Sequence, residues 1–73
     1  KPILVGTRDR RADESFLPFR LIDGHAYEVT KVDERGMIHL RNPWNNTHPP
    51  LLRIGQFKAY FKPDISRWSD CGL

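Results

Sequence analysis

Two polar side chains in this sequence have the types and the positions that proton-transfer chemistry requires. His25 lies in the string G-H-A-Y over residues 24–27, and Asn42 lies in R-N-P-W over residues 41–44. An imidazole can take up and release a proton, and a neighbouring carboxamide can fix the ring in one orientation. Such a pair suits a cysteine nucleophile, because the imidazole ion-pairs with the thiolate and later protonates the leaving amine.

The elements around these residues predict that the two side chains meet. Residues 25–32 are typical of a strand, the string D-E-R-G over 33–36 predicts a turn, and residues 37–41 form a second strand-like run. An antiparallel hairpin brings the start of its first strand close to the end of its second. We therefore expect the side chains of His25 and Asn42 to approach within about 2.6 to 3.2 Å of each other.

These ordered motifs resemble those of the calpain-like cysteine proteases, in which G-H-A-Y carries the catalytic His and R-N-P-W-G the catalytic Asn. Residues 3–7 are similar to the strand that precedes the His strand in bacterial members, and residues 57–61 to the short helix after the Asn loop. The likeness extends over residues 2–68 and departs at Asn45, where the family has Gly. An Asn tolerates the left-handed turn expected there. The resemblance implies the β-rich C-terminal half of a papain-like catalytic core, of bacterial type.

The resemblance also implies roles for single residues. His25 would be the general acid and base, and Asn42 would orient it. Trp44 would pack over this pair and shield its hydrogen bond from water, although a Trp is ordinarily a core residue. Gly24 would let a substrate backbone approach, although it could simply begin the strand.

The nucleophile is the missing group. The single cysteine, Cys71, follows both motifs and has no helix after it to lower its pKa, so we do not expect it to attack a substrate. The resemblance implies a partner, an N-terminal helical half with the catalytic Cys, and a protein or peptide substrate. Alone, the chain should be inert, and Phe16, Phe19 and Trp44 should expose apolar surface that favours self-association.

Composition and charge limit the remaining classes of function. Twelve Lys and Arg against nine Asp and Glu give a net charge of +3, with three arginines at positions 8, 10 and 11. Acidic residues interrupt these arginines, so a solvated loop over 8–16 is favoured over a nucleic-acid surface. His39 and His48 lack metal-ligand spacing with His25 or Cys71, and no cofactor is predicted. One cysteine gives no internal disulfide, which favours a reducing compartment, and we expect a soluble chain without membrane span or targeting signal.

The expected fold is α+β and mostly β, a small antiparallel sheet or partial barrel with one short helix in a single domain over 1–73. The first strand covers residues 3–7. Apolar spacing predicts a helix over 54–61 that ends before Pro63, with Ile54, Phe57, Tyr60 and Phe61 on its buried face. Residues 65–68 are expected to close the sheet as a last strand, and 69–73 to form a tail. The alternative function is a protease-derived interaction module without catalysis.

Overall fold

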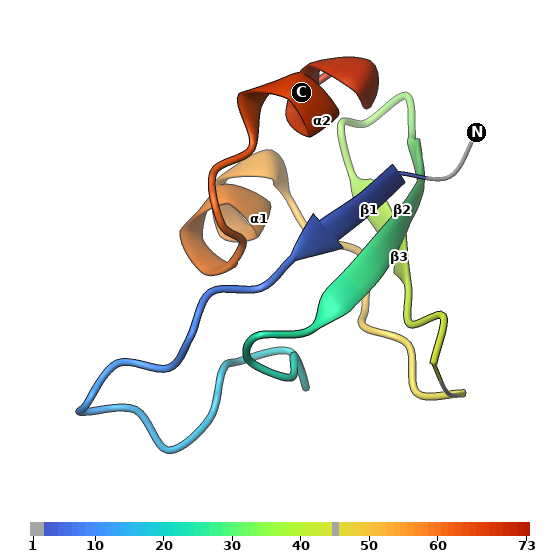
Figure 1. Ribbon diagram of the computed structural model, residues 1–73. Helices are drawn as coiled ribbons and strands as arrows, with labels where there is room; N and C mark the ends of the chain where they lie inside the picture. Colours follow the sequence, from blue (N-terminus) through green and yellow to red (C-terminus); the bar gives the residue numbers. More distant parts are fainter. Residues whose placement is uncertain (1–2, 45) are drawn as a thin grey trace.

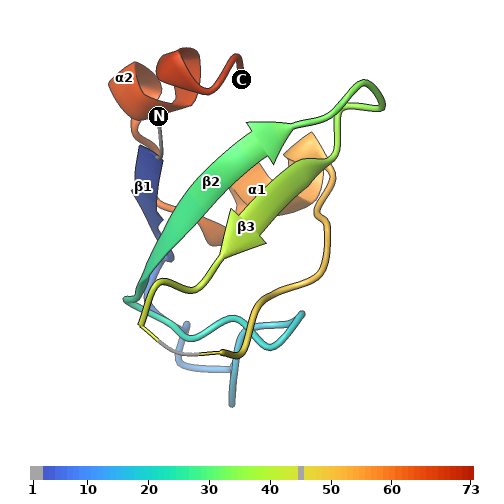
Figure 2. The ribbon, with the colours of Figure 1, turned by 90° about the vertical axis from the view of Figure 1, so that its right-hand side faces the viewer.

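The computed structural model describes residues 3–44 and 46–73; the turn expected at Asn45 lies outside the described residues. It contains a three-stranded antiparallel sheet in the order β1-β2-β3, followed by two short helices. The strands are β1 (Ile3–Gly6), β2 (Ala26–Val32) and β3 (Ile38–Arg41). Figures 1 and 2 show α1 against the sheet and α2 at the end where β1 begins. The α+β, mostly β fold predicted from the sequence is confirmed.

The hairpin of β2 and β3 contains a bulge that the sequence analysis did not predict. The register pairs Val29 with Leu40 but Lys31 with His39, so Thr30 is the extra residue. Thr30 and Lys31 are both exposed in consequence. The bulge allows Val29 and the apolar residues of β3 to face the core on either side of the shift.

Both edges of the sheet are covered by later segments of the chain. Leu52 exchanges two backbone hydrogen bonds with Ile38, of 2.7 and 3.1 Å. At the other edge, Thr7 bridges to Phe61, and the Lys62 backbone N–H donates to the carbonyl of Gly6 at 2.8 Å. These contacts leave fewer unpaired backbone N–H and C=O groups along the two edge strands.

Helix α1 (Ile54–Tyr60) agrees with the helix predicted over 54–61, except that Ile54 is exposed and that Phe61 is the extended C-cap residue after the helix. The Gln56 side chain accepts a hydrogen bond from the backbone N–H of Arg53 at 2.9 Å and so satisfies a donor at the helix start. Phe57 is fully buried and stacks on Phe61, with ring centroids 4.5 Å apart. The core therefore forms between this helix and the sheet.

The predicted strand over 65–68 is wrong, because these residues begin α2 (Ile65–Asp70). Asp64 accepts a hydrogen bond from the backbone N–H of Arg67 at 3.3 Å, which is an N-cap contact. Trp68 is buried against Phe57 while Ile65 stays exposed. Residues 69 and 70 of the expected tail belong to this helix, and Cys71 and Leu73 pack against the core.

None of the helices in residues 3–44 and 46–73 has the length and apolarity needed to cross a bilayer.

Candidate active site

The side chains of His25 and Asn42 meet where β2 begins and β3 has just ended. The His25 Nε2 atom lies 3.0 Å from the Asn42 Oδ1 atom, within the reach expected from the hairpin. The His25 side chain is partly buried, and Asn42 is only 1% exposed. The predicted approach of the two groups is confirmed.

The hydrogen bond also fixes which ring nitrogen is free. The Oδ1 atom of a carboxamide can only accept, so Nε2 of His25 must donate its proton to it. In the neutral ring, Nδ1 then carries a lone pair and can accept a proton from another group. The Asn42 amide thus orients the ring through Nε2 and leaves Nδ1 as the nitrogen that can accept a proton.

Asn42 is held in place by two further contacts. Its Oδ1 atom accepts a second hydrogen bond from the backbone N–H of Trp44 at 3.1 Å, and its own backbone N–H donates to Nδ1 of His48 at 3.0 Å. Trp44 is not a core aromatic, since its side chain is 66% exposed. Within this chain its backbone stabilises the pair, and shielding by the ring stays a prediction.

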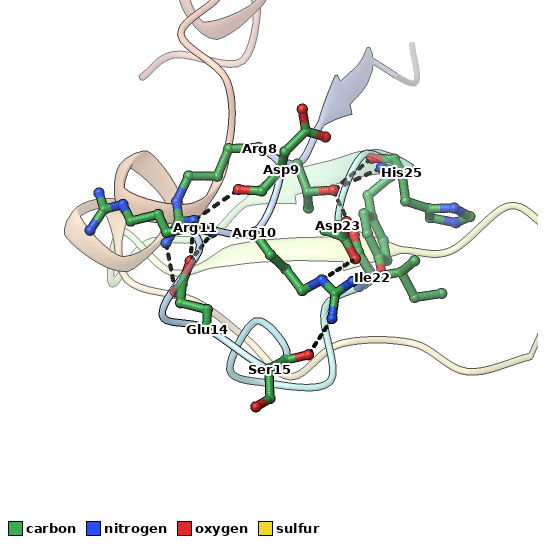
Figure 3. Close-up of polar contacts among 11 residues, drawn as sticks. Arg8, Asp9, Arg10, Arg11, Glu14, Ser15, Ile22, Asp23 and His25 are labelled. Atoms are coloured by element: carbon green, nitrogen blue, oxygen red, sulfur yellow. Dashed lines mark hydrogen bonds and ion pairs between the residues drawn. The ribbon is translucent and has the colours of Figure 1, made fainter.

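The backbone of His25 is fixed by Thr7, which is fully buried. The Thr7 hydroxyl donates to the carbonyl of Ile22 at 2.6 Å and accepts from the backbone N–H of His25 at 2.8 Å. The backbone N–H of Thr7 donates to the carbonyl of His25 at 2.9 Å. The ring of Tyr27 meets the imidazole edge to face, with centroids 4.9 Å apart. These contacts hold the imidazole at the end of the sheet, and Figure 3 shows it pointing away from the arginine-rich loop.

Gly24 adopts a conformation that favours glycine. Its φ is +59°, and an added Cβ would lie 3.2 Å from the Oδ1 atom of Asp9. The residue is exposed. A side chain here would strain the turn that leads into His25, and the role of Gly24 in substrate binding stays a prediction.

Ion pairs connect arginines of the loop over 8–16 to nearby carboxylates. Arg8 binds both carboxylate oxygens of Glu14, at 2.7 and 3.1 Å, and this contact lowers the pKa of Glu14 to about 2. Arg10 forms an ion pair with Asp23 at 3.4 Å (Figure 3). Two of the three clustered arginines are therefore paired with carboxylates, and the absence of nucleic-acid binding stays a prediction.

Cys71 lies apart from the pair. It caps the end of α2, at the end of the sheet opposite to the start of β2 (Figures 1 and 2). Burial, and then the charge of Asp70, raise the pKa of the Cys71 thiol, so the thiolate is disfavoured at neutral pH. Among the described residues, no group of three His, Cys, Asp or Glu side chains lies close enough to hold a metal ion.

Sequence analysis missed two residues of the site, Thr7 and His48. The spacing of His48 excludes it as a metal ligand but does not indicate its contact with Asn42, which depends on how the loop after β3 folds back. A threonine that directly follows an apolar strand is a weak signal for a buried hydroxyl. No sequence pattern indicated its bond to His25, which is 18 residues away.

The comparisons with known proteins give one partial match. A segment of 47 residues is 45% identical to human calpain-9, and the match covers 55% of this chain. The chain spans about 7% of the length of that relative. No protein-family model matches the chain, and no solved structure does. The likeness to a calpain supports the resemblance read from the motifs, whereas the expectation of a bacterial source stays a prediction.

Proposed function

We propose that this chain carries the His–Asn half of a calpain-like cysteine endopeptidase. The observation that carries the proposal is the 3.0 Å contact of His25 Nε2 with Asn42 Oδ1, which leaves the other ring nitrogen free as a base. The partial match to calpain-9 supports the same assignment.

In the proposed reaction, Nδ1 of His25 takes the proton of a cysteine thiol supplied by an N-terminal helical half. The thiolate attacks the peptide carbonyl, and the imidazolium then protonates the leaving amine. Asn42 keeps the ring oriented, and its Oδ1 atom stabilises the positive charge on the imidazolium. Water finally hydrolyses the acyl-enzyme, with His25 again acting as the base.

The isolated chain should have no peptidase activity, because neither His25 nor Asn42 can form the acyl intermediate. The raised pKa of the Cys71 thiol and its place beyond α2 support this expectation. Peptidase activity of the isolated chain that is lost on Cys71→Ser would contradict it.

The test is to add a calpain-type helical half in trans and to measure cleavage of an unfolded protein. His25→Ala should lower kcat by about 10²- to 10⁴-fold, because it removes the acid–base group. Asn42→Ala should lower it less, because only the orientation of the ring is lost. His39→Ala is the matched control, since that imidazole bonds to Asp33 at 2.9 Å instead. Full activity of the His25→Ala variant would end the proposal.

The second candidate is an interaction module without catalysis, and exposed apolar side chains favour it. Phe16 is 76% exposed and Trp44 66%, as expected from the sequence, whereas Phe19 packs on the core beside Tyr60. A module should self-associate or bind a partner even when His25 is replaced. Sedimentation across a concentration series, with the His25→Ala variant alongside, separates the two functions.

A further inference from the structure

A hollow of about 340 Å³ lies between the loop before β2 and the loop after β3. Its lining residues are Phe19 and Arg20 from the loop before β2, and His48 and Pro50 from the loop after β3. His48 connects the hollow to the pair, because its Nδ1 atom accepts the backbone N–H of Asn42. A ligand bound here would therefore contact a residue that is hydrogen-bonded to the backbone of Asn42.

Arg20 is held in the wall of this hollow in an unusual conformation. Phe19 and Arg20 have φ values of 61° and 59°, a region that residues other than glycine rarely adopt. Leu17 and Leu21 are buried on either side of them and anchor the segment. Residues with this backbone geometry persist where the surrounding structure imposes it, and they concentrate at binding sites.

The cation of Arg20 is unpaired. Its side chain is exposed, and it makes no ion pair or hydrogen bond with any residue in 3–44 or 46–73. Of the other arginines near this end of the sheet, Arg8, Arg10 and Arg41 are paired with Glu14, Asp23 and Glu28, whereas the Arg11 side chain has no ion pair among the described residues. Among the described residues that line the hollow, none is acidic and could neutralise Arg20.

His48 adds a second donor. Because its Nδ1 atom accepts the Asn42 N–H, the neutral ring must carry its proton on Nε2. This N–H has no partner among the described residues. The hollow thus offers a guanidinium and an imidazole N–H as donors, and the rings of Phe19 and Pro50 as an apolar wall.

We propose that this hollow binds a carboxylate. The two donors can each bind one of its oxygens, and a guanidinium matches the planar carboxylate group. The apolar wall fits the aliphatic stem of an Asp or Glu side chain, or the last residue of a peptide that ends in a free carboxylate. The role of the hollow in catalysis rests on the proposed function. In a protease it would be a substrate subsite that favours acidic residues near the bond to be cleaved.

The test is peptide binding to this chain, followed by NMR of the Arg20 guanidinium and the His48 imidazole. Three tripeptides separate the two sources of a carboxylate: acetyl-Ala-Glu-Ala-amide, acetyl-Ala-Gln-Ala-amide and acetyl-Ala-Gln-Ala with a free C-terminus. The first or the third should shift both signals in a saturable way, and the second should not. Response to the first alone identifies a side-chain subsite, and response to the third alone identifies capture of a chain end.

The variants test the role of each donor. Arg20→Asn removes the cation but keeps a residue that tolerates positive φ, and it should lower carboxylate affinity about tenfold or more. Arg35→Gln is the control, because it removes one positive charge at the hairpin turn, away from the hollow. His48→Ala should also weaken binding and should shift the Asn42 amide signal.

Equal saturable shifts with all three peptides, no saturable shift with any peptide, or unchanged affinity in a folded Arg20→Asn variant would overturn the proposal. Because binding needs no nucleophile, this result is separate from the peptidase test. Carboxylate binding without cleavage in the reconstituted enzyme would reject the proposed protease and leave only the carboxylate-binding site in place. Cleavage without carboxylate binding would reject the subsite alone.

Discussion

The helix side of the sheet and its loop end are stabilised by different kinds of contact. On the helix side, α1 and α2 bury an aromatic cluster in which Phe57 stacks on Phe61 and meets Trp68 at 5.4 Å. At the loop end, where β2 begins and β3 ends, His25 and Asn42 are held by directed hydrogen bonds. Apolar burial depends on area, whereas hydrogen bonds depend on geometry.

This difference indicates how a small domain can position the side chains of His25 and Asn42 without a large core. Apolar burial on the helix side forms much of the core, so the loop end can keep a partly exposed imidazole and an arginine that has no ion pair among the described residues. Variants on the helix side should therefore cause the largest losses in the free energy of unfolding, whereas variants at the loop end should cause smaller losses, and those around His25 should also change the position of its ring. The predictions below test this division, from the largest expected effect to the smallest.

Phe57→Ala should be the most destabilising change. Phe57 is fully buried and contacts two other aromatic rings, so its removal loses apolar burial and leaves a cavity. We expect a loss of about 3 to 5 kcal/mol in the free energy of unfolding, measured by urea denaturation. Phe16→Ala is the control, because the 76% exposed ring should contribute less than about 0.5 kcal/mol. Similar losses in both variants would contradict the division.

Thr7→Val should have a smaller effect on stability and a specific effect on His25. The valine keeps the shape but leaves the buried carbonyl of Ile22 and the N–H of His25 without their hydroxyl partner. We expect a loss of about 1 to 3 kcal/mol in unfolding free energy. The His25 imidazole signals should shift by NMR, whereas those of His39 should not.

Thr7→Ser is the matched variant for this experiment, because it keeps the hydroxyl. It should restore the His25 signals to their original positions. If the serine and valine variants disturbed His25 equally, the hydroxyl would not be what positions the ring.

The elements predicted correctly from the sequence are those that local patterns determine. Alternating and β-branched residues predict the strands, and the D-E-R-G turn predicts the hairpin. The hairpin in turn explains why the approach of His25 and Asn42 could be foreseen. The strand predicted over 65–68 is wrong because Asp64, directly before Ile65, is a helix N-cap residue and starts α2 instead.

The parts that could not be predicted depend on contacts between distant segments. The bond of His48 to Asn42 requires the loop after β3 to turn back, and the positive φ of Phe19 and Arg20 requires the buried leucines on either side. Neither geometry follows from residue type.

The bulge at Thr30, by contrast, has a local signal in the sequence. Two polar residues separate Val29 from Val32, where strict alternation needs one.

The smallest predicted effect is the loss of the Arg8–Glu14 contact in acid. Hydrogen bonds from Arg8 and from the backbone of Arg11 lower the pKa of Glu14 from 4.5 to about 2 in the folded chain. A lowered pKa stabilises the fold above pH 4.5, and this contribution declines as the pH falls from about 4.5 toward 2. The difference in unfolding free energy between the original chain and Glu14→Gln should therefore shrink over that window. Because the ion pair is near the surface, the difference should also be smaller at high salt. Glu34→Gln, at the exposed hairpin turn, should show no comparable change, and a Glu14→Gln difference that stays constant from pH 5 to pH 2 would contradict the assignment.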